Sequence, residues 1–152
     1  MAMESSPLEE WFPNLATAGY VITSPVRLMY NCYAWAAGEN AHWWEPGRVM
    51  THYYWPPDLL PANTLEIHIQ LFVIIGFVAC EDSKLEAGFE KVALYAHANG
   101  TASHAARQLA SGVWTSKLGI YEDITHNTLE ALEGDVYGTV AQILRRPHSN
   151  TP

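Results

Sequence analysis

Cysteines and basic residues are few in this chain, and each shortage excludes a class of protein. Cys32 and Cys80 are the only cysteines among 152 residues, which is too few for a disulfide framework and predicts two free thiols in a cytoplasmic protein. Lys and Arg together number 8 against 16 Asp and Glu. Because a phosphate-binding surface needs clustered positive charge, neither nucleic acid nor an anionic membrane is an expected partner.

Long apolar runs and metal-binding motifs are also missing. The longest apolar stretch, residues 67–79, is interrupted by His68 and Gln70 and is too short to span a bilayer. The first seven residues contain neither the basic segment nor the apolar run of a signal peptide. Since no Cys-x-x-Cys or His-Glu-x-x-His motif occurs, we expect no metal and no other cofactor.

The length and composition predict a single α+β domain. A chain of 152 residues, 49% of them hydrophobic, is long and apolar enough to build one core. Prolines interrupt residues 1–25, which are expected to form an irregular lead-in. Residues 26–146 are expected to form the domain, and residues 147–152 a flexible tail.

Local signals predict two helices separated by a long loop. Residues 26–37 are expected to form a helix that carries Cys32 and packs on a small antiparallel sheet. Residues 38–62 form a loop rich in Trp, Tyr and Pro, of a length that is usually functional. Thr64 is a good N-cap for a helix that ends near residue 75.

The second half of the chain predicts the sheet. Three short runs, residues 91–96, 103–109 and 113–119, are separated by turns that contain glycine, which is typical of an antiparallel meander. A last helix is expected at residues 128–132, and residues 137–145 are expected to form either a strand or a helix that closes the domain.

Cys32 lies where a loop turns into the first predicted helix. A thiol at a helix N-terminus lies in the positive end of the helix dipole, which lowers its pKa and raises its thiolate fraction. This position predicts a nucleophile. The structural alternative is a buried free cysteine that acts as a small hydrophobic residue, which is the commoner role for a cysteine taken alone.

A histidine and a hydroxyl group follow Cys32 in the order that nucleophilic catalysis needs. A nucleophile requires a general base within hydrogen-bond reach, and the base requires a third group to orient it. His104 lies on the middle run of the meander and Ser116 on the next run, so antiparallel pairing can bring them together. Thr115 and Lys117, on the same run, are the alternatives to Ser116 as the orienting group. Ser116 shares a strand face with Trp114, which we expect to shield the contact from water.

Three other histidines are alternatives to His104 as the base. His42 and His52 lie in the aromatic loop, close in sequence to the cysteine. His126 follows Asp123 by three positions, which would put both on one face of a helix. Such a pair could ligate a metal, although a helix cap and an exposed side chain are commoner roles.

The residues around the predicted nucleophile suggest how a substrate would be held. Trp43, Trp44 and Trp55 could form the wall of a binding site, because aromatic rings offer a large contact area at low entropic cost. The alternative is that these rings cover the core as a lid. Asn31, next to the nucleophile, could donate a hydrogen bond to an oxyanion, and Lys117 could bind a carboxylate.

Two functions fit these residues. The first is a cysteine-dependent hydrolase or acyl transferase that acts on an amide or thioester of a small molecule or peptide. In it Cys32 attacks the carbonyl, His104 transfers the proton and Ser116 orients the imidazole. The second is a non-catalytic module that binds a peptide or partner protein through the Trp- and Tyr-rich loop, with an inert cysteine.

The sequence contains the motifs NCYAWAAG (31–38), WWEP (43–46), YWP (54–56), EKVALY (90–95), HAARQL (104–109) and WTSKLG (114–119). In these motifs the chain resembles a family of small bacterial proteins catalogued as a domain of unknown function. The order of Cys32 and His104 also resembles that of papain-like cysteine hydrolases of the NlpC type. This second resemblance implies a papain-like α+β fold and thiol chemistry.

Overall fold

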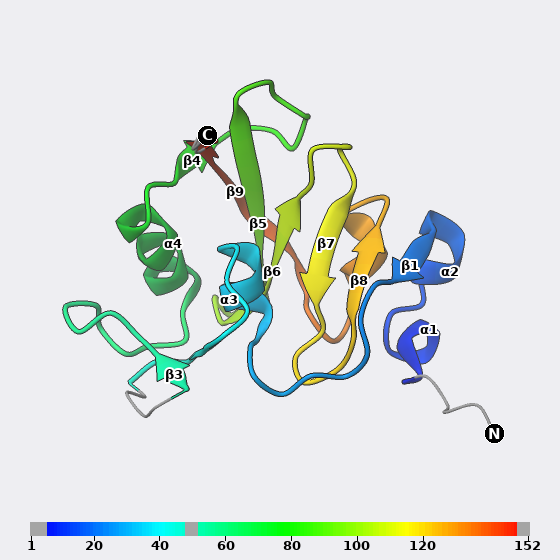
Figure 1. Ribbon diagram of the computed structural model, residues 1–152, viewed down its shortest axis with the longest axis horizontal. Helices are drawn as coiled ribbons and strands as arrows, with labels where there is room; N and C mark the ends of the chain where they lie inside the picture. Colours follow the sequence, from blue (N-terminus) through cyan, green and yellow to red (C-terminus); the bar gives the residue numbers. More distant parts are fainter. Residues whose placement is uncertain (1–5, 48–51, 149–152) are drawn as a thin grey trace.

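The computed structural model describes residues 6–47 and 52–148, and one large antiparallel sheet dominates it (Figure 1). Seven strands follow one another in the order β1-β8-β7-β6-β5-β9-β4, and each neighbouring pair is antiparallel. A separate two-stranded sheet pairs β2 with β3 in parallel. The strands are β1 (Tyr20–Ile22), β2 (Trp43–Trp44), β3 (Tyr53–Tyr54), β4 (Val78–Cys80), β5 (Phe89–Ala96), β6 (Ala102–Gln108), β7 (Trp114–Lys117), β8 (Asp123–His126) and β9 (Thr139–Pro147).

The helices of the described residues are short. They are α1 (Leu8–Trp11), α2 (Leu15–Ala18), α3 (Cys32–Ala36), α4 (Leu65–Ile74) and the 3-10 helix η1 (Glu130–Leu132). Within the described ranges, none of them has the length and apolar character needed to cross a membrane.

The predicted papain-like α+β fold is wrong, because the protein is a sheet-rich fold with only short helices. The helix expected over residues 26–37 is reduced to the five residues of α3. The Asn31 side chain caps α3 at Cys32, and the chain leaves the helix at Ala37, before Gly38 with its φ of 90°. The short helix therefore rests on a sheet much larger than the one expected.

The lead-in predicted to be irregular contains regular structure. Residues 8–18 form α1 and α2, and Tyr20–Ile22 form β1, an edge strand that pairs with β8. At the other end, Pro147, the first residue of the predicted flexible tail, pairs with Phe89 in the sheet. Residues 149–152 lie outside the described part of the chain.

Several local predictions are confirmed. Helix α4 begins after Thr64, whose hydroxyl accepts the N–H of Ile67 at 3.2 Å. The expected meander is formed by β5, β6 and β7. Residues 137–145, for which strand and helix were both open, supply most of strand β9. The helix expected at residues 128–132 is the shorter η1.

Each face of the sheet carries its own hydrophobic core. Val92 and Leu94 pack on the face covered by α3 and α4, whereas Ala93 and Tyr95 pack on the face covered by α1, α2 and η1, as the alternation of side chains along a strand requires. Helix α3 lies against β6 and β7, and Cys32 belongs to the first core (Figure 1).

Candidate functional site

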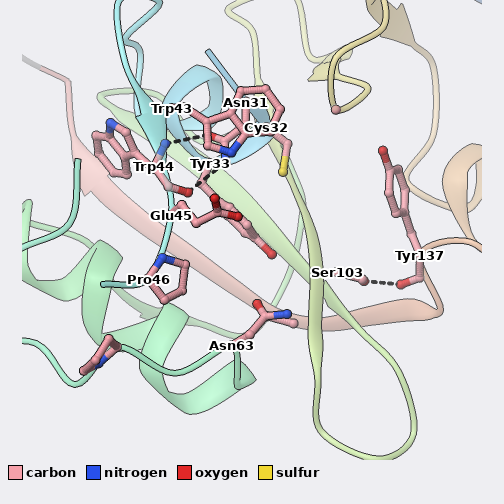
Figure 2. A pocket seen from close by; sticks show the side chains of 13 residues that line it. Asn31, Cys32, Tyr33, Trp43, Trp44, Glu45, Pro46, Asn63, Ser103 and Tyr137 are labelled. Atoms are coloured by element: carbon pink, nitrogen blue, oxygen red, sulfur yellow. Dashed lines mark hydrogen bonds between the residues drawn. The ribbon is translucent and has the colours of Figure 1, made fainter. Parts of the chain in front are cut away.

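A cavity of about 510 Å³ opens beside the first turn of α3 (Figure 2). It brings together residues from α3, the aromatic loop, the start of β6 and the segment before β9. Its lining residues are Asn31, Cys32, Tyr33, Trp43, Trp44, Glu45, Pro46, Pro61, Asn63, Ala102, Ser103, Gly119 and Tyr137. Four residues predicted to form the site, Asn31, Cys32, Trp43 and Trp44, therefore meet at one cavity.

Asn31 connects the aromatic loop to the start of α3. Its Oδ1 accepts the backbone N–H groups of Ala34 and Trp44, at 3.2 and 3.1 Å, and its Nδ2 donates to the carbonyl oxygen of Trp44 at 2.8 Å. The amide thus caps the helix and pairs with Trp44 as a neighbouring strand would. These contacts give Asn31 a structural role in placing the aromatic wall of the cavity beside Cys32.

The thiol of Cys32 lies next to the backbone of β6. The backbone N–H groups of Ala105, the residue that follows His104, of Tyr33 and of Cys32 itself each act to lower the pKa of the thiol. Strands β6 and β7 pair at two positions, Arg107↔Thr115 and Gln108↔Trp114. Helix α3 contacts both of these strands, and Cys32 packs in the core on that face of the sheet.

Burial changes the expected chemistry of this thiol. Cys32 is 7% exposed, and burial raises its pKa to about 12, although the N–H of Ala105, the other backbone N–H groups and the charge of Lys117 act in the opposite direction. The predicted lowering of the pKa by the helix N-terminus is therefore outweighed by desolvation. The thiol is protonated at neutral pH.

His104 and Ser116 meet as predicted. His104 Nε2 lies 3.0 Å from Ser116 Oγ, both side chains are fully buried, and Trp114 lies on the same face of β7. Ser116 Oγ also lies 2.8 Å from His126 Nε2. Burial, reinforced by the neighbouring His126, holds the pKa of His104 well below its usual range. The imidazole is therefore neutral in the folded protein.

Cys32 and His104 lie on opposite faces of the sheet. Side chains alternate along β6, so His104 points away from the face that carries Ala105 and α3. The ring of His104 stacks on the ring of Tyr137, with centroids 4.1 Å apart and planes 8° from parallel. Because Tyr137 lines the cavity, His104 lies directly behind one of its walls. A direct contact between Cys32 and His104 stays a prediction.

Three predicted binding residues lie away from this cavity. Trp55 is buried against α4 and donates from Nε1 to the carbonyl oxygen of Leu59. Trp114 is buried in the opposite core. Lys117 is fully buried, and its Nζ donates to the carbonyl oxygens of Arg27, Gly119 and Tyr121 at 2.8, 2.6 and 2.7 Å. The contacts of these three side chains are structural.

The alternative bases occupy different positions. His42 pairs with the carboxylate of Glu39 and is half-exposed. His126 lies on a strand, so it shares no helix face with Asp123, and it reaches His104 through Ser116. Among the described residues, no cluster of His, Cys, Asp and Glu could hold a metal ion.

Sequence reasoning missed Tyr137 and the role of His126. Tyr137 stands in a loop between η1 and β9, far along the chain from the cysteine, and a lone tyrosine there carries no local signal. His126 could have been noticed because β7 and β8 are joined by a short turn. In that hairpin Ser116 faces Ile124, so His126 is its diagonal neighbour on the same face.

These features define a sheet-rich domain with a buried thiol at an aromatic-walled cavity and a buried histidine pair behind it. The chain belongs to the family described as Domain of unknown function (DUF7689), whose model matches residues 21–145. This confirms the resemblance to a domain of unknown function. No curated protein and no solved structure matches the chain, and nothing supports a bacterial origin or the resemblance to NlpC-type hydrolases.

Proposed function

We propose that the protein is a cysteine-dependent hydrolase or acyl transferase, with Cys32 as the nucleophile and His104 as the general base. One observation carries the proposal: Cys32 lines a cavity large enough for an acyl group, and His104 stacks on Tyr137, which lines the same cavity. Ser116 Oγ lies 3.0 Å from His104 Nε2 and supports the proposal as the group that orients the base.

The protonation states favour attack by a neutral thiol. Both Cys32 and His104 are uncharged at neutral pH, so the thiol proton passes to His104 Nδ1 as the sulfur forms its bond to the carbonyl carbon. The protonated imidazole then returns this proton to the leaving amine or thiol as its bond to the carbonyl carbon breaks. Water, or an acceptor molecule, finally releases the acyl group from Cys32.

Backbone N–H groups supply the electrostatic part of this proposal. Those of Ala105 and Tyr33 act to lower the pKa of the Cys32 thiol, so they favour negative charge at the sulfur. Donors fixed in a buried site stabilise a developing negative charge at little reorganisation cost. In this proposal they take the role first expected of Asn31, whose Oδ1 and Nδ2 both bond to Trp44.

The cavity wall suggests an uncharged acyl group. Trp43, Trp44 and Pro46 form an apolar side, and Asn63 and Ser103 add polar groups opposite (Figure 2). Among the described lining residues there is no Lys or Arg, and the Lys117 first expected to bind a carboxylate is occupied by three carbonyl groups. A neutral amide or thioester suits this wall better than an anionic substrate.

A binding module is the second candidate, and the burial of Cys32 favours it. A thiol with a pKa of about 12 is inert toward most reagents at neutral pH. The same aromatic wall would then hold a peptide or small molecule without a reaction.

Covalent capture of an acyl group separates the two candidates. The protein is incubated at pH 7 with p-nitrophenyl acetate, and the modified residue is located by peptide mass spectrometry. We expect an acetyl group on Cys32 in the wild type and in Cys80→Ala, and none at that position in Cys32→Ala. Acetylation of Cys80 without any of Cys32 would contradict the enzyme and leave the binding module.

A further inference from the structure

Behind the cavity, a chain of buried hydrogen bonds runs from a main-chain carbonyl to His104. His126 Nδ1 lies 2.8 Å from the carbonyl oxygen of Thr128, His126 Nε2 lies 2.8 Å from Ser116 Oγ, and Ser116 Oγ lies 3.0 Å from His104 Nε2. His126, Ser116 and His104 are all fully buried. With water excluded, the protons in this chain must be shared among these groups alone.

The position of each proton follows from the carbonyl of Thr128. A carbonyl oxygen only accepts, so His126 carries its proton on Nδ1. Burial lowers the pKa of His126 to about 4, so the ring is neutral and Nε2 is a bare acceptor. Ser116 then donates its single hydrogen to His126.

The direction of the Ser116 hydroxyl also fixes the position of the proton on His104, the candidate base. Because its hydrogen is used toward His126, Ser116 Oγ can only accept from His104, and His104 must carry its proton on Nε2. His104 Nδ1 is then a bare nitrogen, and it is buried with no hydrogen-bond partner among the described residues. A buried acceptor without a hydrogen-bond partner lowers the stability of the fold. An Nδ1 kept in this state is available to accept a proton from another group.

We propose that His126 is a positioning residue that fixes His104, through Ser116, in the tautomer whose Nδ1 can accept a proton. The inference rests on the proposed function, in which that proton comes from Cys32. Without His126, the Ser116 hydroxyl can turn and donate to His104 Nε2, which moves the ring proton to Nδ1. A histidine in that tautomer cannot accept the thiol proton at Nδ1.

This chain of hydrogen bonds from Thr128 to His104 also differs from a catalytic triad, in which the last group is a carboxylate. Each group in it is neutral, so it sets the tautomer and ring orientation of His104 without a negative charge to stabilise an imidazolium. This agrees with the low pKa of His104.

Imidazole nitrogen NMR tests the tautomer directly and needs no substrate. Long-range proton–nitrogen spectra of the wild type should show His104 protonated at Nε2 and His126 protonated at Nδ1. His126→Phe keeps a ring but removes the acceptor, and it should give His104 a substantial or dominant Nδ1-protonated form. Thr128→Ala retains the main-chain carbonyl and is the matched control, in which the tautomers should not change.

The rate of Cys32 acetylation by p-nitrophenyl acetate supplies the second measurement. In His126→Phe it should fall at least about tenfold, because the productive tautomer becomes the minor one, while Thr128→Ala keeps the wild-type rate. A wild-type His104 protonated at Nδ1, or a tautomer unaltered in folded His126→Phe, overturns the inference. An altered tautomer with an unaltered rate overturns it as well.

The two proposals fail in different ways. If wild-type Cys32 takes up no acetyl group, the enzyme proposal fails whatever the tautomers are. If His126→Phe does not fold, the wild-type spectrum still tests the inference, because it shows whether His104 is protonated at Nε2 and His126 at Nδ1.

Discussion

Replacing His104 with alanine is expected to slow acetylation of Cys32 by about 10²- to 10⁴-fold, the range that a general base contributes. The thiol is protonated at neutral pH because burial raises its pKa to about 12, so its attack depends on a group that removes the proton. His104 stacks on Tyr137, which lines the same cavity as Cys32. The measurement is the rate of p-nitrophenolate release at pH 7, with the adduct mapped to Cys32.

Two further variants distinguish the loss of the base from a loss of folding. His104→Gln fills much of the same volume and can still donate to Ser116, but it has no basic ring nitrogen, so it should lose the rate while remaining folded. His97→Ala removes a half-buried histidine from a turn at the end of β5 and should keep the wild-type rate. An undiminished rate in folded His104→Gln would remove His104 as the base.

Replacing Lys117 with methionine is expected to lower the free energy of unfolding by at least about 3 kcal/mol. Methionine retains much of the apolar stem, but it leaves the carbonyl oxygens of Arg27, Gly119 and Tyr121 without their donor. The ammonium group also lies 5.1 Å from the ring centroid of Tyr30 and loses that attraction. Urea unfolding at pH 7 measures the difference.

Lys84→Met is the matched control, since the Lys84 side chain is exposed. A surface substitution of this kind usually changes stability by less than about 0.5 kcal/mol. If Lys117→Met were as stable as Lys84→Met, the three carbonyl contacts would not hold the segment before α3 in place.

Local patterns predicted the elements that depend on neighbouring residues. The Thr64 cap, helix α4 and the meander of β5, β6 and β7 follow from signals a few residues apart. The contact between His104 and Ser116 followed in the same way, because the two strands are consecutive and joined by a tight turn. A register can be inferred where the turn between two strands is short.

Pairings between distant segments could not be predicted in this way. Strand β1 pairs with β8, about a hundred residues later, and the last strand, β9, inserts between β5 and β4. Such contacts depend on tertiary packing rather than on local preference. The seven-stranded sheet, and with it the correct fold, was therefore missed.

The burial and the contacts of each side chain could not be predicted from the sequence either. The position of Cys32 at a helix start predicted a lowered pKa, but the opposite shift follows from burial between α3 and β6. Lys117 was expected to be a cation at a cleft. It is instead bonded to the carbonyl groups of Gly119 and Tyr121 in the following turn and to that of Arg27, which only the fold brings close. Charge and desolvation are properties of the packed site.

The distance between the Cys32 sulfur and His104 Nδ1 is the measurement that tests the central claim most directly. A high-resolution crystal structure of the wild type should place these atoms about 3 to 5 Å apart, close enough for the proton to pass as a substrate binds. The bare Nδ1 should face the sulfur. A distance well beyond 5 Å in the crystal, or an Nδ1 bonded to another group, would contradict the account.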